Sequence, residues 1–262
     1  MDNHDRHKRL LKFVAEHGSA SVGQLASWLG TSPSTVRRDL RLLDLSGQVK
    51  RFHGGGRRID GRHAAALRAN GFMERAGRHP GRKRAIARHA ATLCDAGDTI
   101  MIGGGTTTAA MAAFLAAPAL RILTNSFDVA RRLLASGEHE VILSGGRIYA
   151  DQNLILSPFD TEAIQYCYAD KLFIGAHAVS ALGVRESDPL LVQAGKRLIG
   201  QAQQLIVLAD SSKFANKDGM FLCGLAQVAR VVTDTDAPDA AVQMLERAGV
   251  KVTLVQPDRH AD

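Results

Sequence analysis

Several signals that would assign a sequence to a broad class are missing here. The three cysteines, Cys94, Cys167 and Cys223, lie far apart and form no Cys-x-x-Cys pair, which argues against a disulfide or zinc framework and favours the reducing cytoplasm. No apolar run approaches the ~20 residues of a transmembrane helix, and the N-terminus is polar, unlike a signal peptide. The ten histidines lack metal-ligand spacing, so we expect neither a metal nor another cofactor.

Negative charge is scarce near the N-terminus. The chain has 262 residues and a formal net charge of +7, and residues 1–58 hold eleven Lys/Arg against five Asp/Glu, which gives +6. The remaining residues are nearly balanced, at 22 against 21. A small basic module joined to a larger, near-neutral one is typical of nucleic-acid binding combined with a second function. We predict a DNA-binding domain at 1–60, a Gly-, Arg- and His-rich linker at 61–81 and a second domain at 82–262.

The first module is predicted to contain three helices. Residues 6–17 have helical periodicity, and a second, short helix runs from a Ser21 cap to Gly30, with Leu25, Trp28 and Leu29 on its core face. A third helix covers 32–45, because Ser32 is a good N-cap and Pro33 suits the first turn. Two short helices joined by a glycine turn form a helix-turn-helix.

The outer face of the third helix is basic. Val36, Leu40 and Leu43 recur at helical spacing and predict a buried face, and Arg37, Arg38 and Arg41 fall opposite them. Such a face suits the DNA major groove, although a basic helix in isolation is more often simply solvated. The residues that follow, QVKRFHGGGRRI, predict a basic hairpin, the wing of a winged helix; a glycine-rich surface loop is the alternative. The predicted DNA contacts are Ser32, Ser34, Thr35, Arg37, Arg38, Arg41, Arg51 and His53.

From residue 83 onward, helical and strand-like segments alternate. Apolar strands alternating with helices predict an α/β domain with a mainly parallel sheet covered on both faces. The strand-like runs are 99–102, 121–124, 141–143, 171–174, 205–209, 230–233 and 251–255. The helical patterns are 83–93, 109–116, 127–134, 159–166, 190–201 and 239–248.

Polar and glycine residues follow four of these strands. GGGTTT at 103–108 opens a helix, an arrangement that lets backbone N–H groups approach an anion such as a phosphate; tight strand-to-helix packing is the alternative. Thr-Asn-Ser at 124–126, Ser-Gly-Gly at 144–146 and Asp-Ser-Ser-Lys at 210–213 follow three more strands. Because the carboxyl ends of parallel strands bind ligands in open α/β sheets, we predict a binding site there.

The segment TVRRDLRLLDLSGQVKRFHGGG resembles the N-terminal signature of the DeoR family of bacterial sugar-metabolism regulators, and the likeness continues along most of the chain. It implies a winged helix-turn-helix joined to a sensor domain related in fold to ribose-5-phosphate isomerase. It also implies a regulator, a repressor, of a carbohydrate or sugar-acid operon, with a phosphorylated sugar as effector. Because one small winged helix would bind an operator weakly, we expect a homo-oligomer that reads repeated half-sites. The residues expected to bind this effector are Gly104, Gly105, Thr106, Thr107, Thr108, Asn125, Ser126, Gly145, Gly146, Asp188 and Lys213.

Two departures from the family pattern and one closer likeness narrow this expectation. Family members often have glutamates before the lysine that here is Lys196, and Gly-Pro where this chain has Ser157-Pro158. That serine, Glu-Ser-Asp at 186–188 and Asp-Gly-Met at 218–220 resemble the L-ascorbate-utilisation repressor subgroup. The likeness implies a phosphorylated sugar acid or lactone as effector.

An enzyme and a dinucleotide-binding sensor are the two alternatives to a sugar-phosphate sensor. The related isomerases have acids after the strand that here ends at 174, but this chain has Gly175, Ala176, His177 and Ala178, so we expect a sensor that is not an enzyme. Glu186 and Asp188 are candidates for binding ligand hydroxyls. A sugar-phosphate isomerase or deaminase with an added DNA-binding module is the alternative. GGGTTT lacks the second spaced glycine of Gly-x-Gly-x-x-Gly, and Asn125-Ser126 stand after the next strand where an acid would bind a ribose hydroxyl; both argue against a dinucleotide-binding sensor.

Overall fold

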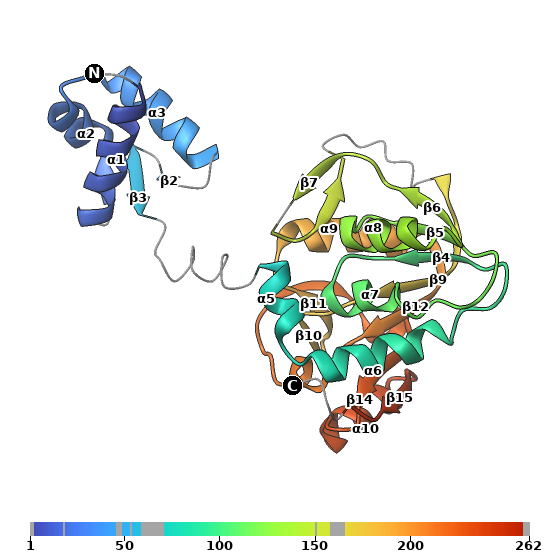
Figure 1. Ribbon diagram of the computed structural model, residues 1–262. Helices are drawn as coiled ribbons and strands as arrows, with labels where there is room; N and C mark the ends of the chain where they lie inside the picture. Colours follow the sequence, from blue (N-terminus) through green and yellow to red (C-terminus); the bar gives the residue numbers. More distant parts are fainter. Residues whose placement is uncertain are drawn as a thin grey trace. The chain divides into compact units, whose positions relative to one another are not determined.

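The computed structural model describes residues 3–17, 19–45, 49–52, 54–58, 71–149, 151–157 and 166–258. The chain divides into two compact units, Met1–Asn70 and Gly71–Asp262 (Figure 1). Within the part of the chain described, no helix has both the length and the hydrophobicity needed to span a bilayer.

The first unit is a winged helix-turn-helix, as the sequence predicts. Its elements are α1 (Asn3–His17), β1 (Ser19–Ser21), α2 (Val22–Leu29), α3 (Pro33–Leu45), β2 (Val49–Phe52) and β3 (Gly55–Arg58). The Ser21 hydroxyl caps α2 by accepting from the Gln24 N–H, and Gly30 ends the helix in the left-handed conformation, with φ of 61°. Side chains from all three helices and from the strands form one core, which includes Leu10, Val14, Leu25, Leu29, Val36, Leu40 and Val49.

Trp28 departs from its predicted place in that core. Its side chain remains 39% exposed. The indole ring packs against Phe13, with ring centroids 4.8 Å apart, and the Arg9 guanidinium lies 5.1 Å from its centroid. A large ring with both apolar and polar parts is stable at the edge of a small core, because one side packs on apolar groups while the other stays in water.

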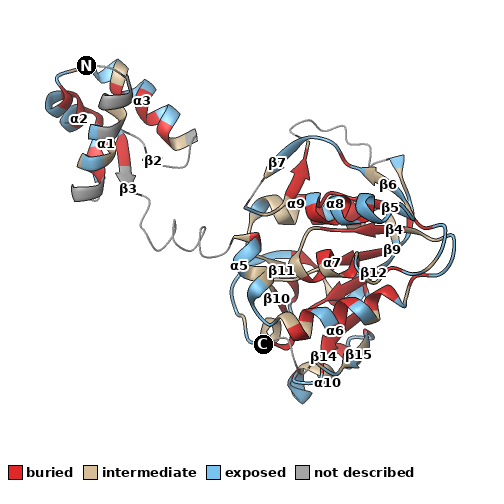
Figure 2. Ribbon diagram, viewed as in Figure 1, coloured by how far each residue is buried: buried red, intermediate tan, exposed pale blue. Residues whose placement is uncertain are grey.

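The second unit is built on a seven-stranded parallel sheet with the order β15-β14-β12-β9-β4-β5-β6. All seven predicted strands are present. Their bounds are β4 (Thr99–Ile102), β5 (Arg121–Thr124), β6 (Glu140–Leu143), β9 (Ala169–Ile174), β12 (Ala202–Leu208), β14 (Val228–Asp234) and β15 (Lys251–Val255). The central strands β4, β9 and β12 are largely buried (Figure 2).

Helices cover both faces of this sheet, as predicted. Ile100 and Ile102 of β4 pack with α6 (Pro80–Ala91), α7 (Thr106–Met111) and α8 (Phe127–Ser136). Met101, between them in sequence, belongs to a second core with α9 (Pro189–Ile199) and α10 (Asp239–Arg247) on the opposite face. The alternation follows from the two-residue period of a strand. The predicted helix at 159–166 falls almost entirely outside the described residues.

Short elements that the sequence analysis did not anticipate complete the second unit. An antiparallel hairpin is formed by β7 (Arg147–Tyr149) and β8 (Leu154–Leu156). A small antiparallel sheet is formed by β10 (Ala178–Ser180), β11 (Gly183–Glu186) and β13 (Met220–Cys223). Part of the segment expected to be a linker belongs to this unit, because α5 (Phe72–Gly77) buries Phe72 in the core and α6 begins at Pro80. Residues 59–70 are not described, so the linker itself stays a prediction.

Candidate DNA-binding surface and effector site

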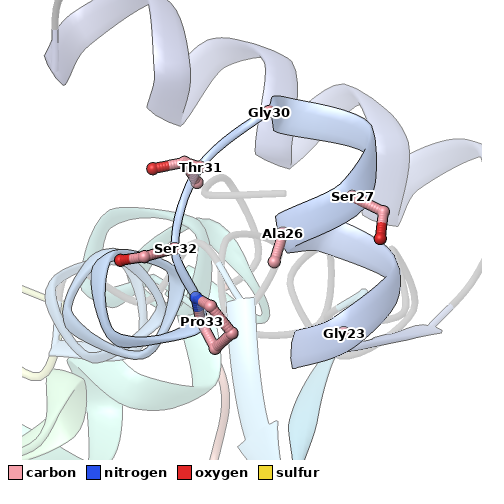
Figure 3. A pocket seen from close by; sticks show the side chains of 7 residues that line it. All are labelled: Gly23, Ala26, Ser27, Gly30, Thr31, Ser32 and Pro33. Carbon is pink, nitrogen blue, oxygen red and sulfur yellow. The ribbon is translucent and has the colours of Figure 1, made fainter.

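The N-terminus of α3 carries a cluster of hydroxyl groups. The Ser32 Oγ accepts from the backbone N–H of Thr35 at 3.2 Å, which confirms Ser32 as the N-cap. The same oxygen lies 2.7 Å from Ser34 Oγ and 2.8 Å from Thr35 Oγ1. Between the end of α2 and the start of α3 is an open groove lined by small and hydroxyl-bearing residues (Figure 3). Its lining is Gly23, Ala26, Ser27, Gly30, Thr31, Ser32 and Pro33.

The basic face of α3 is exposed. Arg37, Arg38 and Arg41 lie in water, whereas Val36 and Leu40 on the opposite side are buried. The three arginines therefore form an exposed basic surface that a polyanion can approach.

One of the two acids of the same helix, Asp39, is turned inward. Asp39 is 2% exposed, and its carboxylate pairs with Arg6 Nε at 2.5 Å and His7 Nε2 at 3.0 Å, both from α1. Burial alone would raise the pKa of Asp39, but the hydrogen bonds and charges of Arg6 and His7 lower it below its ordinary value. The pairing fixes α3 against α1 and keeps negative charge away from the exposed arginines.

The wing is held against α3 by a glycine. A Cβ at Gly56 would come within 2.6 Å of a Leu40 methyl and 2.8 Å of a Val49 methyl, so β3 packs directly on the buried side of α3. The Val22 N–H donates to the Gly54 carbonyl at 2.8 Å, which ties the hairpin turn to α2. The backbone of Arg51 lies in β2, and His53 lies outside the described residues. A role for either in DNA binding stays a prediction.

In the second unit, the loops after β4, β5 and β9 meet at the carboxyl edge of the sheet. The Gly104 N–H donates to Asn125 Oδ1 at 3.1 Å, and the Gly103 N–H donates to the Phe173 carbonyl at 2.9 Å. A Cβ built on Gly105 would lie 3.8 Å from the Gly175 Cα. The first strand of the sheet, β4, has later strands on both sides, and this reversal of strand order is where open α/β sheets bind ligands.

Several residues expected to bind the effector also have a structural role. Thr108 Oγ1 donates to the Gly105 carbonyl at 3.0 Å, and Ser126 Oγ caps α8 by accepting from the Val129 N–H at 3.4 Å. Gly146, with φ of 126°, lies so close to β8 that a Cβ would be 2.3 Å from the Leu156 carbonyl oxygen. Asp188 Oδ1 accepts from the Leu190 N–H at 2.8 Å and caps α9. Their contact with an effector stays a prediction, as it does for Gly104, Gly105, Thr106, Thr107, Asn125 and Gly145.

Lys213 lies among charged side chains, of which the sequence analysis anticipated Glu186 but missed Lys83 and Arg75. It is half-buried on a 3₁₀ turn, η2 (Ser211–Phe214), and interacts electrostatically with Glu186 at the end of β11 and with Lys83 of α6. Arg75 of α5 also acts on Glu186. Lys83 is only 6% exposed. Its spacing from Ile86, Ala87 and Ala90 in the sequence was the available signal, because it puts Lys83 on the core face of its helix.

Burial shifts the ionisation of two of these groups. The pKa of Lys83 is lowered to about 8, chiefly by burial; the charge of Asp210 opposes the shift, and the charges of Lys213 and Arg75 add to it. Burial raises the pKa of Glu186 to about 7, against the opposing hydrogen bond from the Ser187 backbone and the charges of Lys213 and Arg75. The site therefore combines cations with a carboxyl group that titrates near neutral pH.

Family comparison agrees with the two-unit architecture. Residues 6–62 match the model of the DeoR-like helix-turn-helix domain, and residues 78–235 match that of the DeoR C-terminal sensor domain. The chain is 29% identical to the HTH-type transcriptional regulator UlaR of Shigella dysenteriae serotype 1 and of Escherichia coli strain K12 / DH10B, over 97% of this chain and 100% of each relative.

Among solved structures, ribose 5-phosphate isomerase A from Methanocaldococcus jannaschii is 20% identical, with a TM-score of 0.38, over 50% of this chain and 53% of that one. The eIF2B delta subunit from Chaetomium thermophilum is 18% identical, with a TM-score of 0.41, over 54% of this chain and 50% of that one.

Proposed function

Because this chain belongs to the DeoR family of DNA-binding transcriptional regulators, we propose that it represses a carbohydrate or sugar-acid utilisation operon and responds to a phosphorylated effector. Arg37, Arg38 and Arg41 of α3 bind the operator, with Ser32, Ser34 and Thr35 on the DNA backbone. The effector binds at the carboxyl edge of the parallel sheet and changes the affinity for DNA. Because its proposed target is chromosomal DNA, we infer that the protein acts in the cytoplasm.

The strongest support for an anionic effector is the convergence of two kinds of donor at one edge of the sheet. The Gly104 N–H of the glycine loop after β4 lies against Asn125, and Lys213, Lys83 and Arg75 bring positive charge to the neighbouring strand ends. Glu186 and Asp210 supply acceptors for hydroxyl groups. A ligand with a phosphate and several hydroxyls satisfies both sets, and the likeness of 186–188 and 218–220 to ascorbate-operon repressors favours a phosphorylated sugar acid.

The DNA-binding unit is small, and one such unit reads only a few base pairs. Specific operator binding by helix-turn-helix proteins usually depends on two units that occupy repeated half-sites. We infer that the protein acts as a homo-oligomer on such a site.

A sugar-phosphate isomerase or deaminase is the alternative, and one observation favours it. The carboxyl of Glu186, with its pKa raised to about 7, has the ionisation expected of a general base. Against this, the residues directly after β9 contain His177 and no acid, and His177 Nε2 is already bonded to Asp218 Oδ1 at 3.0 Å. The resemblance to regulators favours sensing without turnover.

A thermal-shift screen of the full chain tests the effector site. It compares phosphorylated sugars and sugar acids with their unphosphorylated counterparts, and each compound that binds is then incubated with the protein and assayed for chemical change. We expect phosphorylated compounds alone to raise the melting temperature, and none to be converted. Turnover that Glu186→Gln abolishes would overturn the assignment as a sensor, and equal binding of unphosphorylated compounds would overturn the phosphate site.

A further inference from the structure

A buried lysine fastens the first helix of the second unit. Lys83 Nζ donates to the backbone carbonyl of Arg75, near the C-terminal end of α5. The same carbonyl also accepts from the Arg78 N–H at 3.3 Å. The Arg75 carbonyl therefore keeps one donor when the lysine moves away and is not left without a hydrogen bond.

The other contacts of α5 lie at the β7–β8 turn and in the core. The Phe72 N–H donates to the Asp151 carbonyl at 3.1 Å, and the Arg75 guanidinium donates to Gln152 Oε1 at 2.7 Å. Phe72 is buried among residues of the α6 and α7 face. Because α5 is the first element after the boundary between the two units, the chain enters the second unit through it.

The same lysine also faces the predicted effector site. Its charge interacts with Asp210 and Lys213, the first and last residues of the Asp-Ser-Ser-Lys segment. Asp210 is 1% exposed, and within the described part of the chain its Oδ2 atom has no hydrogen-bond partner. A buried carboxylate oxygen without a hydrogen-bond donor is unfavourable. A ligand group that donates a hydrogen bond to Asp210 Oδ2, beside Lys83, would therefore be stabilising.

We propose that Lys83 is an effector-contacting residue that links occupation of the site to α5. An anionic group of the effector draws the Lys83 ammonium away from the Arg75 carbonyl, because a charge-assisted bond to an anion is stronger than one to a neutral carbonyl. The C-terminal end of α5, the first element of the second unit, then loosens. This link rests on the anion site proposed above.

Amide hydrogen exchange of the full chain tests the link, with inorganic phosphate as the probe. Lys83→Met keeps the unbranched shape and most of the length of the side chain and removes its charge and donors; since burying the ammonium is unfavourable, this variant is expected to fold. Arg84→Met, at the exposed neighbouring position of α6, is the matched control. Without phosphate, we expect residues 72–78 to exchange about tenfold faster in Lys83→Met than in the wild type, as for loss of one charge-assisted hydrogen bond.

Phosphate is expected to accelerate exchange at 72–78 in the wild type and in Arg84→Met, and to have no further effect in Lys83→Met. Unchanged exchange at 72–78 in ligand-free Lys83→Met would overturn the link, and so would an equal phosphate response in all three proteins. Peptides covering 103–108 and 210–214 report on the anion site independently. If phosphate protects them without changing α5, the site stands and the link falls; if phosphate protects neither peptide, the anion site and the link both fall.

Discussion

The two units of this protein use positive charge in opposite ways. Arg37, Arg38 and Arg41 of α3 are exposed on a helix whose other side forms the core, whereas Lys83 and Lys213 lie buried or half-buried at the carboxyl edge of the sheet. Exposed charges are screened by salt and suit a long polyanion that supplies many weak contacts. Charges removed from water suit one small anion that fills a defined space. The difference in exposure therefore distinguishes cations suited to a polyanion from cations suited to one small anion.

The largest expected effect concerns the stability of the first unit. Asp39 is the buried charge on α3, a helix whose arginines are exposed. Asp39→Ala leaves Arg6, whose side chain is 12% exposed, without its counter-ion, and we expect a loss of about 2–3 kcal/mol in the free energy of unfolding of the first unit. Urea unfolding followed by the fluorescence of Trp28, the only tryptophan in the chain, measures this unit alone. Arg41→Gln, an exposed change on the same helix, should stay within about 0.5 kcal/mol of wild type.

The same pair predicts the direction of a pH effect on the first unit. The pKa of Asp39 is lowered in the folded state from its ordinary 3.8. Its contribution to stability is therefore present above pH 3.8 and lost as the pH falls through the folded-state pKa. Acid unfolding of Asp39→Ala should lack this component; an acid profile identical to wild type would show that the Asp39 pair does not stabilise the unit.

The next largest effect concerns Lys213. A lysine–phosphate bond is charge-assisted and contributes roughly 1.5–3 kcal/mol, so Lys213→Ala should weaken effector binding about 10- to 100-fold. Lys217→Ala, at an exposed lysine four residues later, is the control and should bind as the wild type does. Calorimetric titration of both variants with a compound from the thermal-shift screen measures the difference. Equal affinity in the two variants would remove Lys213 from the site.

A smaller effect is expected for each exposed arginine of α3. An arginine that contacts a DNA phosphate adds roughly 0.9 to the magnitude of the log–log slope of affinity against salt. An arginine that reads a base edge instead contributes about 1–3 kcal/mol of discrimination at one base pair. Operator binding by Arg37→Ala and Arg38→Ala at several salt concentrations separates the two roles. Unchanged affinity and slope in both variants would show that α3 does not occupy the groove.

The smallest effect is a change of effector affinity with pH. As the pH rises from about 6.5 to 9, Glu186 becomes charged with a pKa of about 7 and Lys83 becomes neutral with a pKa of about 8. Both changes make the site less attractive to an anion, so affinity should fall several-fold. The other charged groups that act on this pair are Arg75, Arg78, Asp188, Asp210 and Lys213. Titrations at several pH values should show that Lys83→Met lacks the upper of the two steps; if that step persists in the variant, it does not arise from Lys83.

The sequence predicted the parts of the fold that depend on local patterns. The Ser32 cap, the buried Val36 and Leu40 and the seven parallel strands follow from capping chemistry and apolar periodicity, and the strand ends were found because parallel strands end at one edge. The six-residue α5 was missed because its stability comes from Phe72 in the core and from contacts with residues 151–152, far away in sequence. The sequence analysis missed the cations Lys83 and Arg75 for the same reason, because it is tertiary packing that brings them close to Glu186 and Lys213.

The most direct test of a regulator with these two kinds of charge is an operator titration of the full chain, with and without a phosphorylated sugar that the protein binds. An effector changes DNA affinity only by its different affinity for the free and DNA-bound states, so the change must saturate at the effector concentrations that fill the site. We predict that operator affinity falls as the compound saturates the wild type, and that Lys213→Ala needs about 10- to 100-fold more of it for the same fall. Operator affinity that stays constant while the effector site is filled would contradict the proposed regulation.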